Sequence, residues 1–199
     1  MRIVHLSDTH NQHRQLHDLP EADVIVHSGD AAGLGNKDIS DFFVWFCALH
    51  YKYKIFVKGN HDSRLQTNNF IQSYFPSNFF FLYNSGVTIN GVKFWGLSNS
   101  YFSKNEKKEC FPKMFAKIPS DIDILITHRP PYGILDKSYK SLGCIYLRQA
   151  VLKSSPRYHL FGHVHEAYGI EKVNETTFVN ASLVNEKDEL TNKHVVLDI

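Results

Sequence analysis

The sequence predicts a single α/β domain over residues 1–199, with an α/β first half and a more antiparallel second half. Apolar runs rich in β-branched and aromatic residues indicate buried strands at residues 2–7, 23–27, 53–57, 122–127 and 157–161. Helical periodicity separates several of these strands. The pair Asn90-Gly91, between two short strands, predicts a tight hairpin in the second half.

Two helices are expected in the first half, and a longer and a shorter one in the second. Residues 40–49 place an apolar stripe that includes Phe42 and Phe46 on one helix face. Residues 63–74 form the next helix candidate, with Ser63 as its N-cap. The helix of the second half is predicted at residues 142–153, and a shorter one near 112–117 within a surface loop. Further strands are predicted at 79–83, 87–89, 92–97, 167–173, 176–180 and 194–199.

Composition and charge are those of an ordinary globular protein. The hydrophobic fraction is 43%, the charged fraction is 21%, and the net charge is +2 with neutral histidines. Such a weak net charge does not favour a nucleic acid polymer or a membrane as the partner. The chain has neither a run of eighteen apolar residues nor a secretory signal, so a cytoplasmic location is expected.

The cysteines do not indicate disulfides or a thiolate metal site. Cys47, Cys110 and Cys144 are odd in number and far apart, and are predicted to be small buried hydrophobes. His5 and His27 lie inside predicted strands and are interpreted as packed core or edge histidines.

Metal-type donor groups follow five of the predicted strands. Glycine precedes three of these groups, which lets the backbone turn sharply there. Every donor is a nitrogen or an oxygen, a set that suits Mn, Fe or Zn. Eight groups are too many for one ion and suit two ions about 3.5–4 Å apart that clamp a phosphate ester. The eight residues are Asp8, His10, Asp30, Asn60, His61, His128, His163 and His165.

Asp8 and His10 lie two residues apart, so on an extended backbone their side chains point to the same side. The ordered blocks Asp-x-His, Gly-Asp, Gly-Asn-His-Asp, His before Pro-Pro and Gly-His-x-His resemble the calcineurin-like metallophosphoesterase superfamily. The blocks run from residue 8 to residue 165. Further stretches are similar to the MPPED-type branch of class III phosphodiesterases, at residues 127–136, 143–144, 159–169 and 179–182.

The resemblance implies a four-layer α/β/β/α sandwich of two mixed β-sheets with helices outside. It also implies two divalent metal ions, with Mn expected and Fe or Zn as alternatives. Asp30 would bridge the two ions, and a hydroxide shared by them would be the nucleophile. The implied ligands of the first metal are Asp8, His10 and His165, and those of the second are Asn60, His128 and His163.

The resemblance assigns His61 a place beside the metals, as the general acid that protonates the leaving oxygen. Two neighbouring residues depart from the pattern or are not explained by it. Arg129 stands where glycine is common in the branch, and it either clamps a phosphate or points to solvent. Asp62 is expected to face away from His61, so the group that orients His61 is not identified.

The implied activity is dinuclear-metal-dependent hydrolysis of phosphate esters by a phosphodiesterase or phosphatase. The expected substrate is a small phosphate ester such as a nucleotide or cyclic nucleotide, and a phosphomonoesterase is an alternative. A non-enzymatic scaffold on the same fold is a second alternative, against which the complete ligand set counts. A nuclease subunit is a third, and the weak net charge disfavours it. The sequence does not indicate an oligomeric state.

Overall fold

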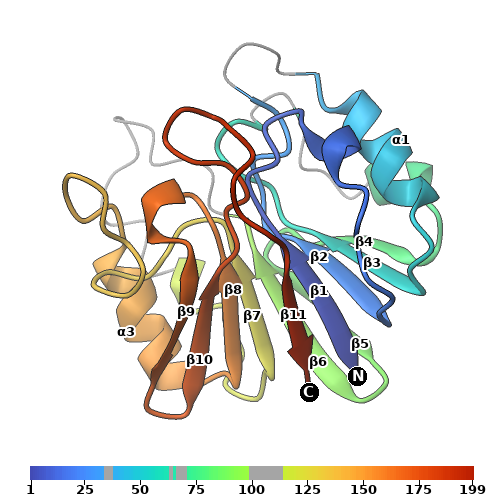
Figure 1. The fold of residues 1–199 in the computed structure, drawn as a ribbon. Coiled ribbons are helices and arrows are strands. Elements are labelled where there is room, and N and C mark those ends of the chain that lie inside the picture. The colour runs from blue at the N-terminus through green and yellow to red at the C-terminus, as the bar shows by residue number, and fades with distance from the viewer. Residues whose placement is uncertain (34–37, 63–64, 66–70, 99–113) are drawn as a thin grey trace.

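The computed structural model of the chain describes residues 1–33, 38–62, 65, 71–98 and 114–199 (Figure 1). The helices are α1 (Ser40–Ala48) and α3 (Ile145–Ser154), with 3-10 turns η1 (His13–Gln15), η2 (Ile71–Tyr74) and η3 (His165–Ala167). The first strands are β1 (Arg2–Leu6), β2 (Val24–His27), β3 (Tyr53–Phe56), β4 (Phe79–Phe81), β5 (Ser85–Ile89) and β6 (Val92–Leu97). The remaining strands are β7 (Ile124–Thr127), β8 (Tyr158–Phe161), β9 (Gly169–Val173), β10 (Thr176–Asn180) and β11 (Val195–Asp198).

The strands form two mixed sheets, as expected. The first has the order β11-β1-β2-β3-β4, in which β1 to β4 are parallel and β11 is antiparallel to β1. The second has the order β5-β6-β7-β8-β10-β9, with four parallel central strands and antiparallel edge strands. Figure 1 shows the sheets face to face, with α1 and α3 on opposite outer sides.

Three apolar layers hold this sandwich together. Between the sheets, Ile3 and Val26 of the first sheet belong to one cluster with Ile126 and Leu160 of the second. Phe46 of α1 is fully buried against the outer face of the first sheet. On the outer face of the second sheet, α3 contributes Leu147 and Val151. Each fully buried side chain of this size stabilises the fold by about 1.5–3 kcal/mol. Two sheets packed face to face with a helix on each outer side confirm the predicted four-layer architecture.

The hairpin prediction is correct, and several element boundaries differ, among them those of α3 and β9. Asn90 and Gly91 both have positive φ, at 49° and 85°, and connect antiparallel β5 and β6. Helix α3 begins at Ile145 because the Cys144 sulfur accepts a hydrogen bond from the Leu147 amide and caps the helix. Strand β9 begins at Gly169 rather than at 167, since the preceding residues form η3.

Parts of two helix predictions lie outside the described residues. Of the segment 63–74, the structure describes residue 65 and the 3-10 turn η2, and the N-cap assigned to residue 63 is outside the description. Of the segment 112–117, residues 112 and 113 are outside it, and residues 114 and 115 are helical. Among the described helices, none is long and apolar enough to cross a membrane.

Buried histidines make the stability of this fold depend on pH. His5 and His27 are fully buried in the first sheet, as predicted, and His159 is fully buried in the second. Burial lowers the pKa of each to about 3, against about 6.5 in an unfolded chain. Between pH 6.5 and 3 the unfolded state therefore binds more protons, and stability falls as the pH falls.

We expect the free energy of unfolding to drop between pH 6.5 and 4 by up to about 1.4 kcal/mol per pH unit for each of these histidines. Urea unfolding at several pH values measures this slope. His159→Gln should make the slope shallower by up to about one proton, because the glutamine side chain does not titrate. Replacing the exposed His50 by glutamine is the matched control. An unchanged slope in His159→Gln would contradict the prediction.

Candidate metal centre

The carboxyl ends of the parallel strands of both sheets meet at one edge of the sandwich, and the eight predicted site residues follow those ends. Three groups of side chains there have ligand atoms that all lie within 4.8 Å of one another. The first group is Asp8, His10 and His165, the second is Asp30, His128 and His163, and the third is His10, Asp30 and His61. The structure thus brings together seven of the eight residues in these groups.

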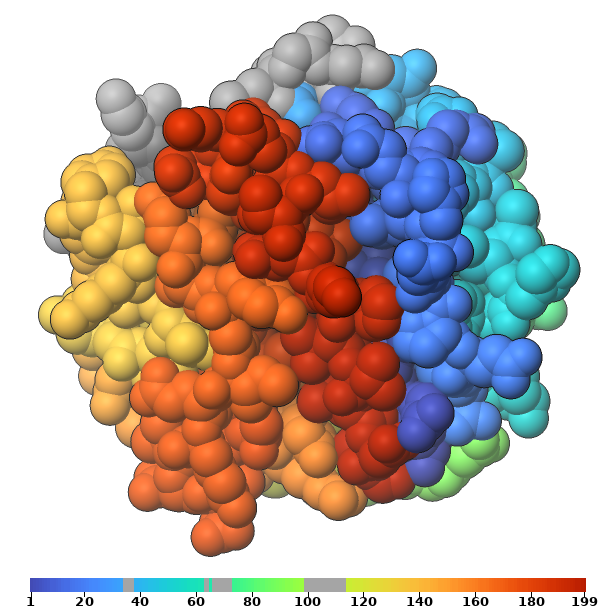
Figure 2. Space-filling model, viewed as in Figure 1, coloured from blue at the N-terminus to red at the C-terminus, as the bar shows by residue number. Residues whose placement is uncertain are grey.

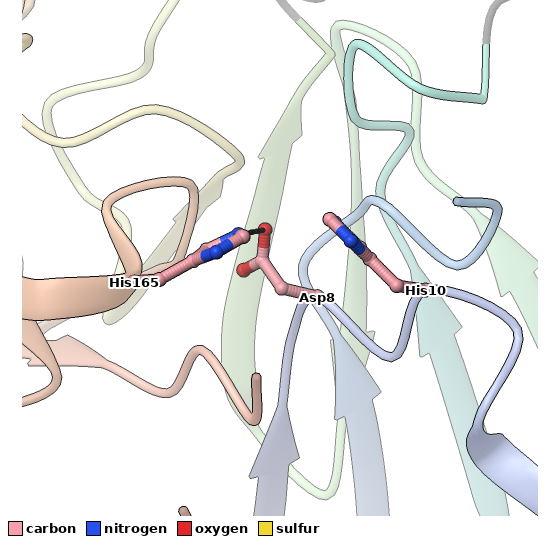
Figure 3. Close-up of side chains that lie close together, drawn as sticks. All are labelled: Asp8, His10 and His165. Carbon is pink, nitrogen blue, oxygen red and sulfur yellow. Dashed lines mark ion pairs between the residues drawn. The ribbon is translucent and has the colours of Figure 1, made fainter. Parts of the chain in front are cut away.

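Asp8 lies between two imidazole rings in the first group (Figure 3). Its Oδ1 is 3.4 Å from Nε2 of His165. Its other oxygen, Oδ2, accepts hydrogen bonds of 2.9 Å from the amide of His163 and from the hydroxyl of Ser182. These two bonds fix the carboxylate so that Oδ1 remains directed toward the histidines.

His128 and His163 lie side by side in the second group. The Nε2 atom of His128 is 3.0 Å from Asp30 Oδ2 and 3.2 Å from Nδ1 of His163. The other ring nitrogen of His128 is 3.0 Å from the carbonyl oxygen of Ser28, which can accept its proton. The two rings and the carboxylate thus converge on a common point, as ligands of one ion do.

Asp30 connects the groups. It belongs to both the second and the third, and its side chain is 2% exposed. Oδ1 accepts a 2.7 Å hydrogen bond from the backbone amide of His61, and Oδ2 lies 3.7 Å from Nε2 of the same residue. A carboxylate shared in this way is suited to bridge two cations.

Four of these residues have a backbone conformation that side chains other than glycine rarely adopt. Asp8, His10, Asp30 and His163 have φ between 42° and 72°. The backbone after β1 is therefore not extended, and the reason given above for the proximity of Asp8 and His10 is wrong. Each such residue costs about 1–2 kcal/mol, and strain of this kind concentrates at functional sites.

The glycines before the site residues serve two different purposes. Gly29 has a φ of 108° and makes a sharp turn, as predicted. Gly59 and Gly162 do not have positive φ, although the chain bends at the residue after each of them. A Cβ atom on Gly59 would collide with Asp30, and one on Gly162 would collide with Asp8. Glycine is required at these two positions because the backbone approaches the carboxylates closely.

Asp62 is 1% exposed, and its carboxylate forms hydrogen bonds with residues other than His61. Its carboxylate accepts hydrogen bonds from three backbone amides, those of Gly59 at 2.8 Å, Asp30 at 2.9 Å and Ala32 at 3.0 Å. It therefore ties the loop after β2 to the loop after β3. Burial and the nearby charge of Asp30 raise the pKa of Asp62 to about 6.

The site has opposite charges packed closely together. Burial opposes ionisation of Asp8, but neighbouring histidines, His165 first among them, hold its pKa well below the ordinary value. Burial likewise opposes a charge on His128, yet the carboxylate of Asp30 raises its pKa to about 9. Burial and the charge of His128 lower the pKa of His163 to about 3. The buried carboxylates thus favour positive charge at this position, which a metal cation supplies.

Three buried atoms test whether the residues fit metal ions. Among the described residues, Asp8 Oδ1, His10 Nε2 and Asn60 Oδ1 have no hydrogen-bond partner. An unsatisfied buried polar atom costs about 1–3 kcal/mol, so three in one site indicate a missing partner. Each of the three atoms can donate a lone pair to a cation. Asp8 and His10 belong to the first group, and Asn60 belongs to the Gly-Asn-His-Asp block, so the donor set fits divalent ions.

Arg129 is largely buried next to the second group. Burial lowers the pKa of Arg129, while Cys144 and Asp30 act in the opposite direction. Its charge also contributes to the low pKa of His163. The charge of Arg129 therefore acts on the site, and its Nε atom is buried.

Three residues that contact site side chains were not found by sequence reasoning. Asp188 Oδ1 lies 2.7 Å from His10 Nδ1, and the carbonyl oxygen of Asn185 lies 2.9 Å from His165 Nδ1. Ser182 lies in the stretch 179–182, whose family resemblance could have indicated a role for this residue. No local pattern marks Asn185 or Asp188, since their partners lie 20 or more positions away in the sequence.

Two mixed sheets with aspartate, asparagine and histidine donors at their common carboxyl edge define the class of a metal-dependent hydrolase. Residues 1–167 match the family model described as calcineurin-like phosphoesterase. The chain belongs to this family, and metal-dependent hydrolysis of phosphoesters is the activity that the family implies.

A relative and two solved structures show the same similarity. Metallophosphoesterase domain-containing protein 1 of Homo sapiens is 32% identical over 231 residues, covering 100% of this chain and 71% of that protein. The phosphopantetheinyl hydrolase of Mycobacterium tuberculosis superposes with a TM-score of 0.64 at 11% identity, covering 94% of this chain and 90% of that one. An archaeal phosphodiesterase superposes with a TM-score of 0.51 at 15% identity, covering 99% and 100%. At such low identities the two structures support the fold alone.

Proposed function

We propose that this protein hydrolyses small phosphate esters, such as nucleotides or cyclic nucleotides, with two divalent metal ions, with Mn²⁺ as the expected metal and Fe or Zn as alternatives. One observation carries the proposal. Asp30 belongs to the second group of donors, and its carboxylate also lies within 4.8 Å of a ligand atom of His10, a member of the first group. A mononuclear site would not need both groups or a shared carboxylate.

The first ion would be held by Asp8, His10 and His165. The second ion would be held by Asn60, His128 and His163, and Asp30 would lie between the two ions. When bound, the ions would supply a nucleophile at neutral pH by lowering the pKa of water, and would neutralise the charge of the phosphate. The protein's own part is to hold these donors rigidly, which the hydrogen bonds of Asp8 and Asp30 accomplish.

His61 is suited to deliver the leaving-group proton. It borders the centre through its backbone bond to Asp30, and its side chain is 20% exposed and so accessible to a substrate. Burial lowers the pKa of His61, and Asp30 partly offsets this. A protonated imidazole with a lowered pKa is a stronger acid, which favours transfer of its Nε2 proton to the leaving oxygen.

Arg129 supports the phosphate-ester assignment. Its guanidinium is positively charged and interacts electrostatically with Asp30 and His163, and its N–H groups can donate two parallel hydrogen bonds to a phosphate. In this position it would bind the substrate on the side of the second ion.

The experiment is hydrolysis of bis-p-nitrophenyl phosphate with added Mn²⁺, with p-nitrophenyl phosphate beside it to separate diester from monoester activity. His61→Ala should lower kcat by about 10²–10⁴, the usual contribution of a general acid, with metal content unchanged. The loss should be larger for phenyl than for p-nitrophenyl esters, because the poorer leaving group needs the proton more.

The exposed His17→Ala is the matched control for His61→Ala and should hydrolyse the diester at the wild-type rate. Wild-type protein that binds no metal and hydrolyses neither substrate would instead favour the scaffold alternative. Equal rates for wild type and His61→Ala would contradict the role given to His61.

A further inference from the structure

The segment between β10 and β11 crosses from the second sheet to the first directly at the metal centre. Ser182 forms a parallel bridge with Ser7 at the end of β1, and the amide of Leu183 donates to the Ser7 carbonyl at 3.0 Å. In Figures 1 and 2 this red segment lies on the surface between the blue N-terminal region and the orange region of η3. It follows the residues that match the family model, which end at 167.

Two residues of this segment contact the two histidines of the first group on the sides that face away from Asp8. Asp188 Oδ1 is 2.7 Å from His10 Nδ1, and the Asn185 carbonyl is 2.9 Å from His165 Nδ1. A carboxylate and a carbonyl only accept, so each histidine must carry its proton on Nδ1. Nε2 of both rings is then the free lone pair, directed at the first metal position.

The loop that carries these two acceptors is closed by its own hydrogen bonds. Asn185 Oδ1 accepts from the amides of Lys187 at 2.9 Å and Glu189 at 3.0 Å, and the Asn185 amide donates to the Glu189 carbonyl at 2.9 Å. Gln12 Nε2 donates to the Asp188 carbonyl at 2.6 Å, which ties the loop to the segment after β1. The two acceptors are therefore held in place before any ion binds.

We propose that Asn185 and Asp188 form a clamp that fixes the tautomer and the orientation of both histidines of the first metal position, with Asp188 as the positioning residue of His10. The inference rests on the proposed metal centre. Asp188 is a charged acceptor, whereas His165 and His128 donate to backbone carbonyls. A carboxylate hydrogen-bonded to the second nitrogen of a histidine ligand raises the basicity of that histidine. Losing such a partner typically lowers metal affinity or activity by about 10–100-fold.

Asp188→Gly is the sharpest test, because Asp188 has a φ of 60° that glycine tolerates and alanine does not. Mn²⁺ titration followed by electron paramagnetic resonance counts free and bound ions without any substrate. We expect one of the two ions to bind about 10–100-fold more weakly in Asp188→Gly, and the other as in wild type. Asp188→Asn keeps an acceptor oxygen and should recover most of the lost affinity.

Glu186→Gln is the matched control, since Glu186 is exposed on the same loop and its replacement removes the same charge. It should bind both ions as wild type does. Wild-type affinity for both ions in Asp188→Gly, or an equal loss in Glu186→Gln, would overturn the clamp. A wild-type protein that binds two ions but hydrolyses no phosphate ester would overturn the proposed function instead, while the same titration would still decide on Asp188.

Discussion

Asp62→Ala is expected to lower the free energy of unfolding by about 3–5 kcal/mol, because three buried backbone amides lose their acceptor at once. Each unsatisfied buried donor costs about 1–3 kcal/mol, and partial relaxation of the loops reduces the sum. The same change frees the loops that carry Asp30 and Asn60 from each other, so metal binding should weaken together with stability.

Urea unfolding of metal-free protein measures this loss, and Mn²⁺ titration measures the loss of binding. Glu21→Ala, at an exposed position, is the control that removes an acidic side chain without a buried acceptor. Asp62→Asn should be intermediate, since the amide keeps one acceptor oxygen but turns donor hydrogens toward the backbone amides. A loss below about 1 kcal/mol in Asp62→Ala would show that these three bonds do not hold the site together.

Asp30→Ala is expected to weaken both metal positions, because Asp30 belongs to the second group and also lies within 4.8 Å of a ligand atom of His10 in the first. The loss should exceed about 100-fold, the upper value for removing a mere outer partner of a ligand. Turnover should fall with it. Metal content after dialysis, measured by mass spectrometry, reads out binding directly.

Asp30→Asn separates the charge of Asp30 from its shape. The amide oxygen can still accept from the His61 backbone, so the loop should keep its structure. Without the negative charge, Asp30→Asn should bind the second equivalent of metal only weakly. Two tightly bound equivalents in Asp30→Ala would contradict the role of a shared carboxylate.

The positions of the donors could be predicted because they follow the ends of strands. The carboxyl ends of neighbouring parallel strands meet at one edge, so groups such as Asp8 and Asp30 must lie close together. The hairpin at Asn90-Gly91 was equally predictable, since its turn type requires positive φ at both residues. The four-layer arrangement followed from the family resemblance.

The supporting contacts could not be predicted, because they join residues that are far apart in sequence or depend on backbone detail. His10 and Asp188 are 178 positions apart, and no local pattern links them. Asp8 has a left-handed φ of 53°, and its carboxylate accepts a tertiary hydrogen bond from the amide of His163, 155 positions away. The need for glycine at position 59 comes from the closeness of Asp30, which only the folded chain shows.

The most direct test of the dinuclear centre is the rate of bis-p-nitrophenyl phosphate hydrolysis by metal-free protein as Mn²⁺ is added in measured equivalents. If Asp30 is shared between two ions, activity should rise steeply with the second equivalent and level off at about two per chain. Activity that is complete at one equivalent of Mn²⁺, or hydrolysis that persists with excess chelator, would contradict the dinuclear centre.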